Sequence, residues 1–102
     1  MSQTLTEPIL GLGREFPESL IVLHHPATGT YGCYGFNGVH GLACFTSEQS
    51  AIRFGSQIDL PGMITLRTTF DEAREIAKSR PAQIVALILL DPPAEPLVHY
   101  IR

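Results

Sequence analysis

The order of hydrophobic and polar positions along the chain changes period several times, and each change marks an expected element. Residues 1–18 show no period, because prolines and glycines interrupt their few apolar positions, and we expect an extended N-terminal arm there. Residues 19–25 form a short run of strand-forming residues, and residues 26–29 (Pro-Ala-Thr-Gly) have type I turn chemistry. The pattern therefore predicts an arm followed by one domain over residues 19–102.

Asn37 and Gly38 separate two strand-like segments, and this pair predicts a tight hairpin. Asn-Gly tolerates the positive φ angles that a type I′ turn requires. The turn fixes a register in which the facing pairs are Phe36 and Val39, Gly35 and His40, Tyr34 and Gly41, Cys33 and Leu42, and Tyr31 and Cys44. One face of the hairpin then carries Tyr31, Cys33, His40, Leu42 and Cys44, because strand side chains alternate between faces.

Glycines recur at every third position from Gly29 to Gly41. In a strand this spacing places glycines on both faces of the hairpin, and each leaves a notch, meaning a position without a side chain. Such notches usually receive a neighbouring side chain, as Tyr34 would over Gly41, or they permit twist and bulging. They also let a ligand approach the backbone. We favour packing and keep ligand binding as the alternative.

Two segments have helical spacing, and each begins with a capping-box pattern. Thr46 with Gln49 begins the first, whose apolar positions are Ala51, Phe54 and Ile58 and which we expect to end at Gly55 or at Pro61-Gly62. Thr69 with Glu72 begins the second, whose apolar stripe is Phe70, Ala73, Ile76 and Ala77 and which we expect to end before Pro81. Residues 63–68 between them form a short strand.

Residues 84–90 are all apolar, which is typical of a central strand covered on both faces. A proline-rich turn over residues 91–96 leads to a last strand over residues 97–101. The expected order is three strands, a helix, a strand, a helix and two strands. This order predicts an α+β fold with a mixed or mainly antiparallel sheet and both helices packed on it.

Charge and composition narrow the classes of partner. The chain has 102 residues, 44% of them hydrophobic, and a net charge of −3, and its basic residues are scattered. Proteins that bind nucleic acids or anionic membranes usually carry a continuous row of basic residues. The scattered basic residues of this chain form no such row, so we expect neither partner. The N-terminal residues lack the pattern of a signal peptide, and two cysteines fit a reduced compartment, which predicts a cytoplasmic location.

The histidines and cysteines do not have the spacing of a metal centre. Zinc needs four converging ligands, whereas His40 and Cys44 lie roughly 13 Å apart on one strand face. Cys33 lies diagonal to His40, so a thiol–imidazole contact is conceivable, but buried cysteine more often packs as a small hydrophobe. We therefore assign no metal, cofactor or catalytic residue and retain Tyr31, Cys33 and His40 as candidate ligand-binding residues.

Residues 43–54 (ACFTSEQSAIRF) and 66–92 (LRTTFDEAREIAKSRPAQIVALILLDP) resemble SseB-type domains, the serine-sensitivity-enhancement family, over residues 43–92. The resemblance implies a small non-catalytic domain. HGLACFTSEQSA, with the later VALILLD and LVHYIR, is also similar to small ADP-ribosyltransferase-like domains. That likeness implies that His24 or His40, with Ser47, would hold the nicotinamide end of NAD, although no catalytic glutamate is assignable.

The leading hypothesis is a non-catalytic interaction or regulatory domain that binds a protein partner or a second copy of itself. It rests on a candidate edge strand, because an unpaired edge recruits partners by strand addition. The residues of this edge are Leu97, Val98, His99, Tyr100 and Ile101. The alternative is a small-molecule binder or enzyme that uses the glycine-rich hairpin and His40.

Overall fold

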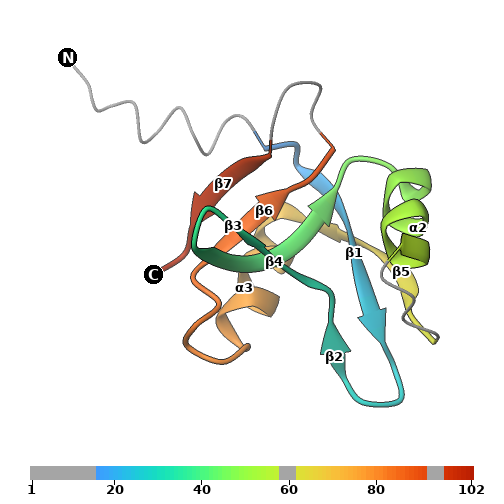
Figure 1. The fold of residues 1–102 in the computed structure, drawn as a ribbon, viewed down its shortest axis with the longest axis horizontal. Coiled ribbons are helices and arrows are strands. Elements are labelled where there is room, and N and C mark those ends of the chain that lie inside the picture. The colour runs from blue at the N-terminus through green and yellow to red at the C-terminus, as the bar shows by residue number, and fades with distance from the viewer. Residues whose placement is uncertain (1–15, 58–61, 92–95) are drawn as a thin grey trace.

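The structure is a computed structural model that describes residues 16–57, 62–91 and 96–102 (Figure 1). Its elements, in chain order, are β1 (Ser19–His25), β2 (Thr30–Tyr31), β3 (Cys33–Phe36), β4 (Val39–Phe45), α2 (Glu48–Gln57), β5 (Ile64–Thr69), α3 (Phe70–Lys78), β6 (Ala86–Leu89) and β7 (Leu97–Tyr100). Residues 1–15 of the expected arm, Ile58 and Pro61 of the first helical segment, and most of the proline-rich turn lie outside the described residues.

The strands form one mixed sheet, and the α+β fold is confirmed. The hydrogen-bonded path runs β2-β1-β4-β6-β7, with β3 paired to β4 and β5 paired to β1. All pairings are antiparallel except β4 with β6, which is parallel. Strands β5 and β7 therefore lie at opposite ends of the sheet.

The hairpin between β3 and β4 forms as its turn residues predict. Asn37 and Gly38 have φ angles of 51° and 80°, which match the positive φ values of a type I′ turn. The pairs from Cys33–Leu42 to Phe36–Val39 have the predicted register.

The predicted pairing of Tyr31 with Cys44 is wrong. Tyr31 pairs with His24 of β1, and Cys44 pairs with Val22. The cause lies at Gly32, whose N–H donates to the Leu23 carbonyl at 2.9 Å while its own carbonyl accepts from the Ala43 N–H at 2.9 Å. The single expected strand is thus divided at Gly32 into two strands. The first, β2, pairs with β1, and the second, β3, pairs with β4.

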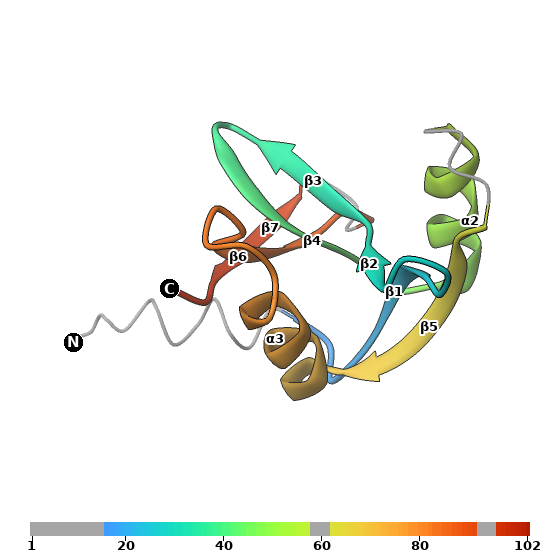
Figure 2. The ribbon, with the colours of Figure 1, turned by 90° about the horizontal axis from the view of Figure 1, so that it is seen from below.

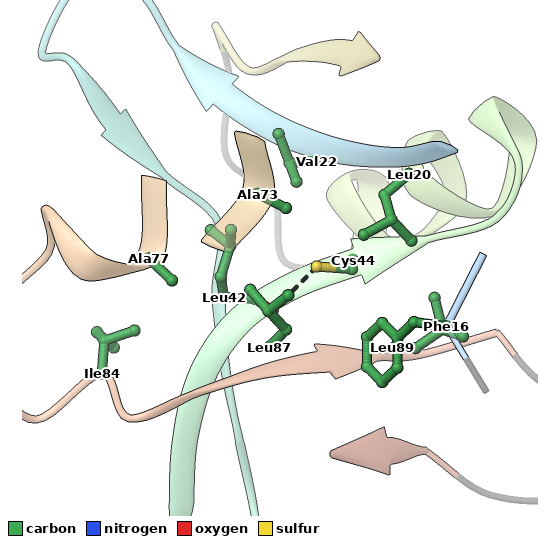
Figure 3. Close-up of a cluster of buried hydrophobic side chains, with 10 residues drawn as sticks. All are labelled: Phe16, Leu20, Val22, Leu42, Cys44, Ala73, Ala77, Ile84, Leu87 and Leu89. Atoms are coloured by element: carbon green, nitrogen blue, oxygen red, sulfur yellow. Dashed lines mark hydrogen bonds between the residues drawn. The ribbon is translucent and has the colours of Figure 1, made fainter. Parts of the chain in front are cut away.

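Two hydrophobic clusters cover opposite faces of the sheet, because neighbouring residues of a strand point to opposite sides. The larger cluster lies beneath α3 (Figure 3) and contains Phe16, Leu20, Val22, Leu42, Cys44, Ala73, Ala77, Ile84, Leu87 and Leu89. The smaller lies beneath α2 and contains Ile21, Leu23, Ala43, Phe45 and Ala51. The helices accordingly lie on different sides of the sheet (Figure 2). Strand β6 is buried along its whole length between β4 and β7, as its uninterrupted apolar run predicts.

The two helices begin differently. Thr69 and Glu72 form the predicted capping box of α3, since each side chain accepts a hydrogen bond from the other's backbone N–H. Thr46 does not cap α2, because its N–H and hydroxyl both donate to the Asp91 carboxylate at 2.9 Å. Ser47 takes its place and accepts from the Ser50 N–H at 3.2 Å. Helix α2 also continues through Gly55 to Gln57.

Arg102 fixes the chain after β7 to the end of α3. Its Nε donates to the Ile84 carbonyl at 2.8 Å, and one terminal nitrogen donates to the Arg80 carbonyl at 3.1 Å. The same nitrogen lies 3.3 Å from the carbonyls of Ala77 and Lys78, which end the helix. A guanidinium is a planar group of fixed donors, so it joins these segments as one unit.

Candidate functional sites

The structure places Tyr31 in a stack of side chains that the sequence did not reveal. The ring of His24 lies 4.5 Å from that of Tyr31, and the guanidinium of Arg80 lies 5.2 Å from the Tyr31 centroid. Arg80 also donates to the Gly29 carbonyl at 3.4 Å. A guanidinium over an aromatic face is attracted by the ring quadrupole, so Arg80 ties the loop after α3 to the β1–β2 turn. No sequence motif includes both Tyr31 and Arg80, so this contact could not be predicted from the sequence.

Cys33 lies beside Tyr31, with its Sγ 3.6 Å from the Tyr31 carbonyl. Cys33 is an exposed residue, but neighbouring atoms partly desolvate its thiol and raise its pKa, an effect that the positive charge of Arg80 opposes only in part. Burial raises the pKa of Cys44 to about 12. The thiolate is the reactive form of cysteine, so both thiols are protonated and weakly nucleophilic at neutral pH.

His40 is exposed and lies two pairs farther along the hairpin than Cys33, opposite Gly35. A Cβ at Gly35 would lie 3.5 Å from the His40 ring, so this ring fills the space beside that glycine. The structure thus brings Tyr31 and Cys33 together, while His40 packs against the backbone of its own hairpin.

Most of the hairpin notches receive the chain's own side chains. A Cβ at Gly41 would lie 2.7 Å from the Ala86 carbonyl oxygen and 2.7 Å from Ile88, and one at Gly32 would lie 3.2 Å from Leu23. Ile88, rather than the expected Tyr34, fills the notch at Gly41. Gly38 has nothing within 4 Å, but it needs its positive φ. Local packing and turn geometry therefore account for these glycines.

The histidine and serine that the ADP-ribosyltransferase likeness would use are far apart. His40 lies near the start of β4 and Ser47 follows its end, and the seven residues of this strand span roughly 20 Å. His24 lies at the far end of β1, where its Nδ1 hydrogen-bonds the Thr30 carbonyl at 3.1 Å. Ser47 is engaged as the cap of α2.

Strand β7 is the end of the sheet path, as expected of an edge, and pairs only with β6 among the described residues. Ile101 donates to the Val85 carbonyl, so in the alternating antiparallel pattern His99 and Leu97 also direct their backbone groups toward β6. The N–H and C=O groups of Val98 and Tyr100 therefore point outward. The Tyr100 side chain is 56% exposed.

The described surface also has three hollows, which are candidate binding sites that the sequence did not indicate. The largest, about 520 Å³, lies between β5 and α3 and is mostly apolar, with Leu66 and Ile76 in its lining and carboxylates on the helix side. A second, about 160 Å³, lies beside Arg53 and Asp91, and a third, about 420 Å³, beside Glu18 and Phe70. Tyr31, Cys33 and His40 line none of the three. The sequence indicated only a solvated charged face where α3 borders the largest hollow.

Among the described residues, no three or more histidine, cysteine or acidic side chains lie together in a way that could hold a metal ion. In the same part of the chain, no helix has the length and hydropathy needed to cross a membrane. No protein-family model matches the chain, and no curated protein matches it.

Proposed function

We propose that this chain is a non-catalytic interaction or regulatory domain that works in the cytoplasm and self-associates through β7. The observation that carries the proposal is that the outward backbone groups of Val98 and Tyr100 pair with no other strand among the described residues. The resemblance of residues 43–92 to SseB-type domains supports the same class of function. The two free thiols support a reducing compartment.

The edge fits a second copy of itself in one simple arrangement. An antiparallel pair centred on His99 places Val98 opposite Tyr100 of the second copy, and each such pair exchanges both backbone hydrogen bonds. It also places a β-branched side chain opposite an aromatic one on the same face, a favourable cross-strand combination. Arg102 holds the end of β7 in place, so the strand does not have to be ordered upon association. The interface is short, and we expect a weak dimer.

Sedimentation velocity over a wide concentration range tests this proposal. Parent protein is expected to show concentration-dependent dimers, and Tyr100→Lys is expected to be monomeric, because a lysine on an edge opposes strand pairing. Ile52→Lys is the matched control, since Ile52 is 54% exposed and lies on α2 rather than on β7. A parent protein that stays monomeric throughout, or a Tyr100→Lys variant that dimerises like the parent, would show that β7 is not the interface.

A further inference from the structure

The hollow between β5 and α3 combines three properties that together indicate the chemistry of an occupant. It has an apolar floor and an acidic wall, and it is lined by Arg67, which belongs to the outer edge of β5. We propose that this groove binds an extended peptide with alternating basic and apolar residues, which adds a strand to the outer edge of β5. The inference goes beyond self-association through β7, because β5 lies at the opposite end of the sheet.

The lip of the groove is the outer edge of β5. The Phe70 N–H donates to the Glu18 carbonyl at 2.8 Å, and the antiparallel register continues from Ser19–Thr69 to His24–Ile64. Since hydrogen-bonded pairs alternate, Leu66 and Thr68 direct their backbone groups toward β1, and Thr65 and Arg67 direct theirs outward. Within the described part of the chain, no backbone group pairs with the outward groups of Thr65 and Arg67.

The floor is made by the side chains that β5 and α3 turn toward each other. Leu66 and Ile76 are partly buried against the larger hydrophobic cluster, and Thr68 is buried with its hydroxyl directed at the Leu20 carbonyl. The volume of about 520 Å³ is within the range of roughly 300–1,000 Å³ that holds small ligands and short peptide side chains. Apolar side chains, or the stems of long ones, fit this floor.

The wall that faces this floor is the acidic side of α3. Asp71, Glu72 and Glu75 line the groove, against one basic residue, Arg67. Within the ranges that the structure describes, the ion pairs of Asp71 and Glu75 are loose and exposed, at 3.6 Å with Arg74 and 3.7 Å with Lys78. A lysine or arginine of the partner can lay its aliphatic stem on Leu66 and Ile76 and bring its charge to these carboxylates.

A peptide fits this combination better than a small molecule does. The outward groups of Thr65 and Arg67 repeat at the two-residue spacing of a strand, which an extended backbone matches and a compact ligand does not. Residues of an added strand alternate in direction, so every second side chain enters the groove beside α3. Backbone pairing supplies affinity, and the acidic wall selects a basic side chain.

The test is fluorescence anisotropy with the full chain and an end-blocked peptide of alternating lysine and valine. Two further peptides carry backbone N-methyl groups either on all lysines or on all valines. Strand addition requires one alternate set of N–H groups to face β5, so one methylated peptide is expected to bind at least about tenfold more weakly and the other to bind like the parent peptide. Equal affinity of both methylated peptides and the parent peptide, or equal loss in both, would overturn strand addition, as would an absence of saturable binding.

Variants of the chain locate the site. Glu75→Gln is expected to weaken binding about two- to fivefold, the size of an exposed ion pair, and Glu48→Gln to leave it unchanged, because Glu48 approaches Thr65 from the α2 side. Thr65→Pro removes an outward N–H and is expected to weaken binding at least about tenfold, while Thr65→Ala keeps that N–H and binds like the parent. Tyr100→Lys is expected to leave affinity unchanged, so failure here and failure of the β7 dimer are distinguishable. Equal effects of Glu75→Gln and Glu48→Gln would place the peptide elsewhere.

Discussion

Replacement of Arg102 by alanine removes a guanidinium that joins the chain after β7 to the end of α3 and the loop before β6. Of its four contacts, those with Ile84 at 2.8 Å and Arg80 at 3.1 Å are good hydrogen bonds, and the two at 3.3 Å are weaker. With allowance for partial exposure, the two good bonds contribute about 1 kcal/mol each. The charge beside the last carbonyls of the helix contributes about 0.3–1 kcal/mol.

We therefore expect Arg102→Ala to lower the free energy of unfolding by about 2–3 kcal/mol. At 4–8 °C per kcal/mol for a domain near this size, a loss of 2 kcal/mol lowers Tm by about 8–16 °C. Urea unfolding followed by circular dichroism measures the free energy, and calorimetry measures Tm. Arg102→Lys is expected to recover only the contribution of the charge, because an ammonium does not reproduce the planar set of donors.

Arg53→Ala is the control, because Arg53 is exposed on α2 and has no hydrogen bond or ion pair in the part of the chain that the structure describes. Its effect is expected to stay within about 0.5 kcal/mol. A Tm for Arg102→Ala within about 2 °C of the parent would refute the reasoning. Full recovery by lysine would show that charge alone, without the geometry of the guanidinium, is responsible.

Two further predictions concern packing and pH. Gly41→Ala is expected to cost about 1–3 kcal/mol in urea unfolding, because the new Cβ meets the Ala86 carbonyl and Ile88 at 2.7 Å; a neutral effect would show that β4 and β6 separate easily. The ring of His99 packs edge-on against Phe16 and Phe70, and burial, with a smaller effect of Arg74, lowers its pKa below the ordinary 6.5. The unfolded chain therefore takes up the proton first, and the free energy of unfolding is expected to fall as pH drops below about 6.5 until the lower folded pKa is passed. His99→Phe should lack this decrease in urea titrations at several pH values, and an equal decrease in both proteins would exclude His99 as its source.

The parts of the fold that follow from local chemistry could be predicted from the sequence. Asn37-Gly38 determined the β3–β4 register, Thr69 and Glu72 determined the start of α3, and the apolar run of residues 84–90 identified β6 as a fully buried interior strand. These signals lie within a few residues of the structure that they specify.

The errors have a common cause, which is competition from distant residues. Asp91 occupies the donors of Thr46 from 45 positions away, so the capping residue of α2 shifts to Ser47. Leu23 accepts from Gly32, which moves Tyr31 from β4 to β1. The groove beside α3 was missed for a different reason, because its acidic residues have the spacing of an ordinary solvated helix face and only the fold places β5 beside them.

The single parallel pairing has a consequence for how the chain is made. Residues 41–44 of β4 pair with residues 86–89 of β6, and α2, β5 and α3 all lie between them in the sequence. Chain synthesis proceeds from the N-terminus at about 5–20 residues per second, so β4 is complete for several seconds before β6 has been synthesised. Until β6 pairs with β4, Leu42 and Cys44 lie beside a strand edge that lacks its partner. A chain in which β6 has not yet paired is therefore prone to aggregation, and the pairing of β6 ends that exposure.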